Sequence, residues 1–304
     1  MSLLQVTIAG VDFKNPVIAA SGAYGFGREY NRLYPIGKLG GVSCKGTTLH
    51  TRSGNPAPRI AETPSGILNS VGLENPGVDH VLEFDLPWIL KQGTVVISNV
   101  AGSTVEETCA TVEKFSESKT DMIELNISCP NVKHGGAAFG VCADSAAAVT
   151  REVRRVCKKP LIVKLSPNVA DIGEIAKAVE AEGADALSLI NTLTGMRIDI
   201  KTRRPILRNN TGGLSGPAVF PVAVRMVSEV YRQVQIPIIG LGGVASWQDG
   251  VEMMLAGASA IQVGTAMFTD PFTPLKIIDG MEEYVREQGL SNISELTGAA
   301  KLWE

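Results

Sequence analysis

The stretch that decides the fold is Met122-Ile123-Glu124-Leu125-Asn126-Ile127-Ser128-Cys129-Pro130-Asn131, a short apolar run that ends in polar residues and a thiol. The run has the length of a buried parallel strand and stops at turn-forming residues. A glycine-rich segment, residues 133–140, follows it and is placed to close over the strand end. Reactive groups in such positions are typical of barrel enzymes. A single cysteine is more often an inert buried residue, so the role of Cys129 depends on its neighbours.

Eight apolar runs of this kind occur along the chain, and eight is the number of strands in a (β/α)8 TIM barrel. They span residues 16–20, 40–44, 94–100, 122–126, 161–165, 186–190, 237–240 and 260–263. Helical patterns fall at residues 104–118, 144–156, 171–182, 217–234, 246–256 and 274–288. Alternating strands and helices predict a parallel sheet. Residues 103–106 fit a capping box, and Gly183 and Gly257 fit helix ends.

Three segments are longer than the usual connections of this fold. Residues 5–13 alternate around Ala9-Gly10 and predict a hairpin that plugs the N-terminal end of the barrel. The segments 46–93 and 193–213 follow the second and sixth strands, on the catalytic face, where such excursions build substrate sites or partner surfaces. No linker or repeat interrupts residues 1–304, so we expect one domain.

Composition excludes several classes of function. The 304 residues are 44% hydrophobic, and 28 Lys and Arg against 31 Asp and Glu give a formal net charge of -3, with no basic cluster for nucleic acid. No segment has the length and apolarity of a membrane span or the pattern of a signal peptide, so we expect a soluble cytoplasmic protein. The five cysteines form no Cys-x-x-Cys pair, and the histidines have no metal-ligand spacing. We therefore expect reduced thiols and no metal or iron–sulfur site within this chain.

The predicted strand ends converge on one cavity and carry amides, lysines and glycines. They are Ser21, Lys45, Asn99, Asn126 with Cys129, Lys164, Asn191 with Thr192, Gly242-Gly243 and Gly264-Thr265. Carboxamides satisfy ring carbonyls and N–H groups together, so this set suits a planar anionic heterocycle such as a nucleobase or a flavin. The glycines after the seventh and eighth strands lie where barrels often hold a phosphate.

Lys164 ends a buried strand, and an unpaired buried cation is costly, so its ammonium should face an anion. It would serve either as a Schiff-base lysine, as in barrel aldolases, or as the counter-charge of an electron-rich cofactor. Aldolase chemistry gives no reason for a thiol at the neighbouring strand end, so Cys129 favours the second interpretation.

With these residues in place, the chain resembles the class 1 dihydroorotate dehydrogenases, and specifically the class 1B catalytic subunit, over essentially its whole length. The motifs that carry the resemblance are Ala20-Ser21-Gly22, Cys44-Lys45-Gly46-Thr47-Thr48, Asn69-Ser70-Val71-Gly72-Leu73, Asn126-Ile127-Ser128-Cys129-Pro130-Asn131, Lys164, Ile190-Asn191-Thr192, Gly216, Gly242-Gly243 and Gly264-Thr265.

The resemblance implies FMN at the mouth of the barrel and dihydroorotate stacked on it. The flavin would contact Ser21, Lys45, Gly46, Asn99, Asn126, Lys164, Ile190 and Gly216, with its phosphate on Gly242, Gly243, Gly264 and Thr265. The substrate would contact Lys45, Asn69, Ser70, Val71, Gly72, Leu73, Asn126, Asn191 and Thr192. Cys129 would be the base that removes the C5 proton while hydride leaves C6 for the flavin N5, and Lys164 would stabilise negative charge on the reduced flavin.

The resemblance also implies a partner. Class 1B enzymes pass electrons to NAD through a second subunit that carries FAD and a [2Fe-2S] cluster, in a heterotetramer built on a homodimer of the catalytic chain. The serine base and N-terminal extension of class 2 enzymes are not matched here. The alternative is the class 1A type, a homodimer that uses fumarate, which gel filtration and acceptor preference would distinguish. An aldolase would be colourless, and a flavin scaffold without its own chemistry would not be bleached by dihydroorotate.

Overall fold

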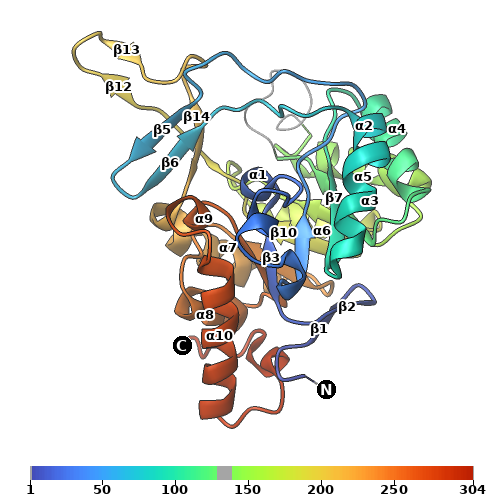
Figure 1. The fold of residues 1–304 in the computed structure, drawn as a ribbon, viewed down its shortest axis with the longest axis vertical. Coiled ribbons are helices and arrows are strands. Elements are labelled where there is room, and N and C mark those ends of the chain that lie inside the picture. Colours follow the sequence, from blue (N-terminus) through green and yellow to red (C-terminus); the bar gives the residue numbers. More distant parts are fainter. Residues whose placement is uncertain (1, 129–138, 304) are drawn as a thin grey trace.

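Eight parallel strands close into a barrel in the computed structural model, which describes residues 2–128 and 139–303 (Figure 1). Each strand pairs with the next in chain order, and the last pairs with the first. The eight strands predicted from the sequence are confirmed, each to within one residue at either end. They are β3 (Val17–Ala19), β4 (Gly41–Ser43), β7 (Val95–Val100), β8 (Met122–Asn126), β9 (Leu161–Lys164), β10 (Ala186–Leu189), β15 (Ile238–Leu241) and β16 (Ala260–Val263).

Within the described residues, six helices cover the outside of the barrel, as the helical patterns predicted. They are α4 (Val105–Ser116), α5 (Ala143–Val156), α6 (Ile172–Ala181), α7 (Phe220–Tyr231), α8 (Trp247–Leu255) and α10 (Thr273–Glu287). Gly183 and Gly257 follow the ends of α6 and α8 with φ of +94° and +129°, as expected for helix ends.

The capping box predicted at residues 103–106 is wrong by one residue. The N-cap of α4 is Thr104, whose side chain accepts from the Glu107 N–H, and the Glu107 carboxylate accepts from the Ser103 N–H at 3.1 Å. Two adjacent hydroxyl residues and two adjacent glutamates give the same spacing twice, so the sequence pattern fits both registers.

Further short helices lie in segments that the sequence left as loops. The longest run follows Pro76-Gly77 and consists of α2 (Val78–His80), a π-helical turn (Val81–Asp85) and α3 (Leu86–Ile89). Pro87 at the start of α3 and the π-helical turn before it interrupt the regular period, which explains why periodicity did not reveal this run. The remaining short helices are α1 (Ser21–Tyr24), α9 (Ala266–Thr269) and the 3₁₀ turns Tyr30–Arg32, Ile36–Lys38, Leu90–Gln92, Pro217–Val219 and Ile293–Leu296.

The predicted N-terminal hairpin is present and plugs the barrel. β1 (Val6–Ile8) pairs with β2 (Val11–Phe13) through a turn in which Ala9 and Gly10 both have positive φ, the conformation of a two-residue hairpin turn. The Phe13 ring is fully buried against the start of β4, so close that a Cβ on Gly41 would lie 2.8 Å from it. The hairpin therefore seals the N-terminal end and leaves the opposite end for the site.

The two long excursions pair with each other above the carboxyl end of the barrel (Figure 1). Their strands form one antiparallel sheet in the order β11-β14-β6-β5, which we call the accessory sheet, and a hairpin, β12-β13, projects from it. Figure 1 shows this sheet and hairpin at the end of the molecule farthest from both termini. The bounds are β5 (Ile60–Thr63), β6 (Gly66–Asn69), β11 (Leu193–Gly195), β12 (Ile198–Asp199), β13 (Arg204–Pro205) and β14 (Gly212–Ser215).

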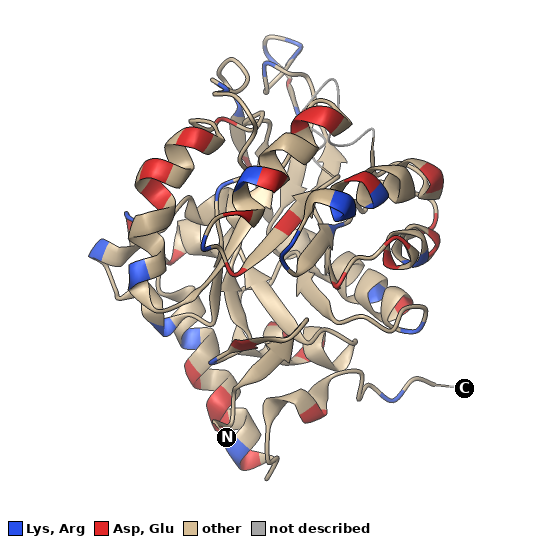
Figure 2. Cartoon of the chain, turned by 90° about the vertical axis from the view of Figure 1, so that its right-hand side faces the viewer, with Lys and Arg blue, Asp and Glu red and all other residues tan. Residues whose placement is uncertain are grey.

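Charged residues lie on the outer helices and loops, with both signs interspersed, while the barrel strands are almost entirely uncharged (Figure 2). Among the described residues, no helix is long and apolar enough to span a bilayer.

The plug yields a prediction for stability. Phe13→Ala removes a fully buried ring from the N-terminal end and should lower the free energy of unfolding by about 3–5 kcal/mol. Val11→Ala, on the same hairpin but only half-buried, should cost markedly less. Urea unfolding of both variants measures the difference, and equal losses would contradict a packed plug.

Candidate active site

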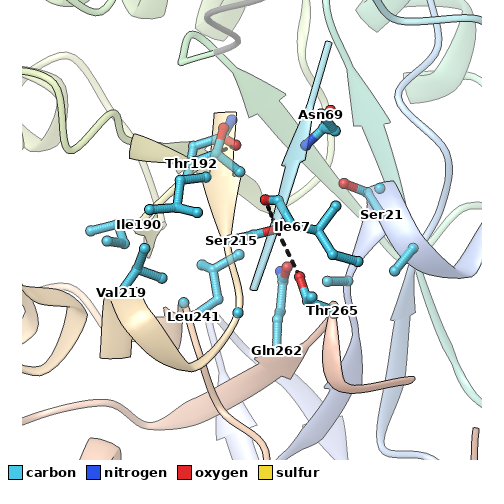
Figure 3. Close-up of a pocket in the computed structure, with 18 of the residues that line it drawn as sticks. Ser21, Ile67, Asn69, Ile190, Thr192, Ser215, Val219, Leu241, Gln262 and Thr265 are labelled. Carbon is cyan, nitrogen blue, oxygen red and sulfur yellow. Dashed lines mark hydrogen bonds between the residues drawn. The ribbon is translucent and has the colours of Figure 1, made fainter. Parts of the chain in front are cut away.

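A cavity of about 390 Å³ opens between the carboxyl ends of the barrel strands and the accessory sheet. Figure 3 shows Asn69 of the accessory sheet on one side of it and Gln262 of β16 on the opposite side. Ser215 links the two layers, because its hydroxyl accepts from Thr265 Oγ1 at 2.8 Å and lies 3.5 Å from the Ile67 carbonyl oxygen (Figure 3). The cavity therefore has a floor made by the barrel and a roof made by the two excursions.

Nearly all the residues predicted for the site line this cavity. They are Ser21, Lys45, Gly46, Asn69, Val71, Gly72, Leu73, Asn99, Asn126, Lys164, Ile190, Asn191, Thr192, Gly216, Gly242, Gly243, Gly264 and Thr265. Ser70 is the exception among the described members of the set, because its side chain is buried in the roof and is not part of the lining. Cys129 and most of the glycine-rich segment lie outside the described residues.

The loops after β15 and β16 form one glycine-rich wall of the cavity. Gly242 and Gly243 have φ of +121° and +81°, and a Cβ on Gly243 would lie 2.8 Å from the Phe220 backbone nitrogen at the start of α7. Within residues 2–128 and 139–303, the backbone N–H groups of Gly243, Gly264 and Thr265 donate to no protein oxygen. Unpaired N–H groups converging on one wall fit a phosphate.

The carboxamides at the ends of β8 and β10 are held by a network around Ser128. The Asn126 Oδ1 accepts from the Ser128 N–H at 3.2 Å and from its hydroxyl at 2.9 Å, and Asn191 Nδ2 donates to Ser128 Oγ at 2.7 Å. Asn191 Oδ1 accepts from the Thr192 N–H at 2.9 Å. The network leaves Asn126 Nδ2 as a donor toward the cavity and fixes the residue that immediately precedes Cys129.

Asn168, which the sequence did not single out, orients the neighbouring Thr192. Its Nδ2 donates to the Thr192 carbonyl at 2.9 Å, and its Oδ1 accepts from the Thr194 N–H at 2.8 Å. A Cβ on Gly213 would lie 2.0 Å from Thr192 Oγ1, so only glycine permits this close approach of β14. The sequence did not reveal this role of Asn168, because its hydrogen-bond partners lie in another segment, 24 and 26 residues away.

Beneath the cavity floor lies a fully buried carboxylate, that of Glu124 on β8. It accepts four hydrogen bonds and faces the Lys164 ammonium, whose Nζ lies 3.8 Å from Oε2. Burial by itself raises the pKa of Glu124, but Lys164 and the hydroxyl and amide donors outweigh it and hold that pKa below its usual value. The donors are Ser43 Oγ at 2.8 Å, Asn99 Nδ2 at 2.5 Å, Ser188 Oγ at 2.8 Å and Gln262 Nε2 at 2.9 Å.

Lys164 therefore faces an anion, as its burial predicted, but the anion belongs to the protein. Glu124 supplies the opposite charge that the burial of Lys164 requires, so this burial is explained without a Schiff base. Glu124 and Gln262 were missed because each sits inside an apolar run. Alternation was the signal that could have found them, since Glu124 shares the inward face of β8 with Asn126.

Comparison with known proteins agrees with this geometry. The sequence model of a family described as dihydroorotate dehydrogenase matches residues 3–285. The catalytic subunit of dihydroorotate dehydrogenase B (NAD(+)) from Petrotoga mobilis is 53% identical over 97% of this chain and 98% of its own length. The corresponding subunits of Parabacteroides distasonis and Bacteroides thetaiotaomicron are 56% and 54% identical, over 98% and 99% of this chain and 98% and 100% of their own lengths.

The buried pair predicts a pH-dependent stability difference. Lys164→Met leaves Glu124 without its cation and should lower the free energy of unfolding at pH 7 by about 3 kcal/mol. In the parent, the depressed pKa of Glu124 adds stability above the unfolded pKa, near 4.3, and this is lost as pH falls through the folded pKa. In the variant, the lowering effect of Lys164 is lost and only the hydrogen bonds still oppose burial, so the pKa of Glu124 should be higher than in the parent and the difference between the two proteins should shrink toward acid pH.

Urea midpoints from pH 7 to pH 3.5 measure this difference. Lys158→Met is the matched control, since Lys158 pairs with Glu117 on the surface, where ion pairs contribute little. A difference that stays constant with pH would contradict coupling between Lys164 and Glu124.

Proposed function

We propose, because this chain belongs to the dihydroorotate dehydrogenase family, that it oxidises (S)-dihydroorotate to orotate in pyrimidine synthesis, with FMN as its flavin and NAD as the final acceptor. The observation that carries the proposal is one cavity lined both by carboxamides and lysines and, after β15 and β16, by unpaired backbone N–H groups. Such a cavity suits a phosphorylated heterocycle.

The residues present fit FMN. Gly242, Gly243, Gly264 and Thr265 would hold its phosphate, and the ring would rest on a floor where Asn99 Oδ1 is buried without a partner among the described residues. When bound, FMN supplies the acceptor for the hydride that leaves the substrate. The remaining ring contacts would come from Ser21, Lys45, Gly46, Asn126, Lys164, Ile190 and Gly216.

Substrate would enter between this floor and the roof. The loop Asn69 to Leu73 and Lys45 would bind its carboxylate end, while Asn126, Asn191 and Thr192 would bind its ring. Asn191 Nδ2 donates to Ser128 Oγ and to Asn126 Oδ1, and Asn191 Oδ1 accepts from the Thr192 N–H, so this side chain offers the substrate the second lone pair of Oδ1. Ser70, buried away from the cavity, would act only through the loop that it anchors.

Cys129 would remove the C5 proton of the substrate. The Ser128 network supports this role, because it fixes the residue before Cys129 at the end of β8. An ordinary thiol has a pKa near 8.5 and is only a few per cent ionised at neutral pH, so the base should work better in mildly alkaline solution.

The electrons would leave through a partner. The relatives bear the name catalytic subunit, which supports the presence of a partner subunit. That partner would carry FAD and a [2Fe-2S] cluster, in a heterotetramer with a homodimer of this chain. Their NAD(+) designation favours this arrangement over the fumarate-dependent homodimer.

The purified protein should be yellow and should bleach on anaerobic addition of dihydroorotate before any acceptor is present. An absorbance spectrum over the range in which flavins absorb, about 350 to 550 nm, records the result. Orotate is the matched control, since it binds without donating electrons. A colourless protein, or a yellow one that dihydroorotate leaves unchanged, would refute the proposal.

Loss of the thiol should slow proton removal without removing the flavin. Cys129→Ala should retain FMN but slow flavin reduction by dihydroorotate by at least about 10²-fold, and the parental rate should rise with pH toward the thiol pKa. Cys142→Ala, which removes an exposed thiol, is the control and should keep the parental rate. Stopped-flow absorbance measures both, and a parental rate in Cys129→Ala would exclude the assigned role.

A further inference from the structure

The Glu124 carboxylate collects side chains from five other barrel strands. Oε2 accepts from Ser43 of β4 and Asn99 of β7, and Oε1 accepts from Ser188 of β10 and Gln262 of β16. Lys164 of β9 approaches Oε2 at 3.8 Å. Two of these donors, Ser43 and Ser188, are fully buried and do not line the cavity, so they cannot contact a ligand there. The other three side chains do line it.

The carboxylate fixes the direction of two amides. Asn99 and Gln262 both turn their NH₂ groups toward Glu124, so their carbonyl oxygens turn the other way. Both oxygens, Asn99 Oδ1 and Gln262 Oε1, are buried and lack a hydrogen-bond partner within the described part of the chain. A buried acceptor without a partner is costly, so each is suited to a donor on a bound ligand.

The carboxylate also sets the charge of the floor. No aspartate or glutamate belongs to the described cavity lining, so the only carboxylate close to the Lys164 ammonium is Glu124, from below. A ligand above Lys164 therefore meets a cation whose field is partly cancelled by an anion on its far side.

We propose that Glu124 is a positioning residue of the cofactor site, which presents two carbonyl oxygens to the flavin ring and limits how strongly Lys164 favours the reduced, anionic flavin. This rests on the proposed function, since it takes FMN as the ligand. Glu124 itself does not touch the ring; it acts through the amides of Asn99 and Gln262 and through its own negative charge, which opposes that of Lys164.

Glu124→Gln tests both effects. The new amide presents NH₂ to at least one of the two existing NH₂ groups, so Asn99 or Gln262 must turn and lose its acceptor direction, which weakens binding of FMN in both redox states. Removal of the negative charge leaves the ammonium uncompensated, so reduced FMN is held relatively more tightly. The ratio of the dissociation constants of oxidised and reduced FMN should rise at least about tenfold. The midpoint potential of bound against free FMN gives this ratio without any turnover.

Ser188→Ala is the matched control, because it removes one donor to Glu124 and leaves the charge in place. It should lower stability and keep the ratio within about threefold of the parent. A purely structural role for Glu124 predicts that Glu124→Gln behaves in the same way, and that outcome would overturn the proposal.

A second comparison keeps the proposal testable if the Glu124→Gln variant folds poorly. On a Lys164→Met background, Glu124→Gln replaces the ion pair by two neutral groups, which buried sites tolerate better than one unpaired charge. At pH 8 the double variant should show a ratio at least about threefold above that of Lys164→Met alone; equal ratios would overturn the proposal. A parent that binds no FMN would instead refute the proposed function, so the two failures are distinguishable.

Discussion

A carboxylate enclosed in the barrel is the constraint on which the rest of the structure depends. Glu124 has no exposed surface, and a buried charge is tolerated only when it is paired and fully hydrogen-bonded. Four donors and one ammonium meet this requirement, and they come from five different strands. The register of those strands is thereby tied to a single group, because a shift of one residue in any of them would turn its polar side chain out of the barrel.

The roof depends on a different kind of contact. β6 and β14 belong to the two excursions, and their pairing sets Asn69 opposite Gly213 although the two residues lie far apart in the sequence. Asn168 then fastens β11 to the loop after β9. The floor is thus positioned by buried side chains and the roof by backbone pairing.

The sequence predicted the barrel because each strand is a continuous apolar run, and it predicted most of the site because functional groups follow those runs directly. It could not show the accessory sheet, since pairing between β6 and β14 is non-local and neither strand has an apolar run of its own. It also hid Glu124 and Gln262, because each is one polar residue inside an otherwise apolar run, and the run as a whole still has the character of a buried strand. Ser70 was included through its motif, whereas its burial depends on the fold of the roof.

The distribution of donors and acceptors explains how one cavity can select a ligand. The floor presents acceptors, Asn99 Oδ1 and Gln262 Oε1, whose direction is imposed by the carboxylate beneath them. The loops after β15 and β16 present donors, the backbone N–H groups of Gly243 and Gly264. A ligand that carries both ring N–H groups and an anionic group satisfies both sets, whereas a ligand that lacks either leaves buried polar groups unpaired. The cavity therefore selects its ligand by the cost of hydrogen bonds left unmade as well as by the contacts that form.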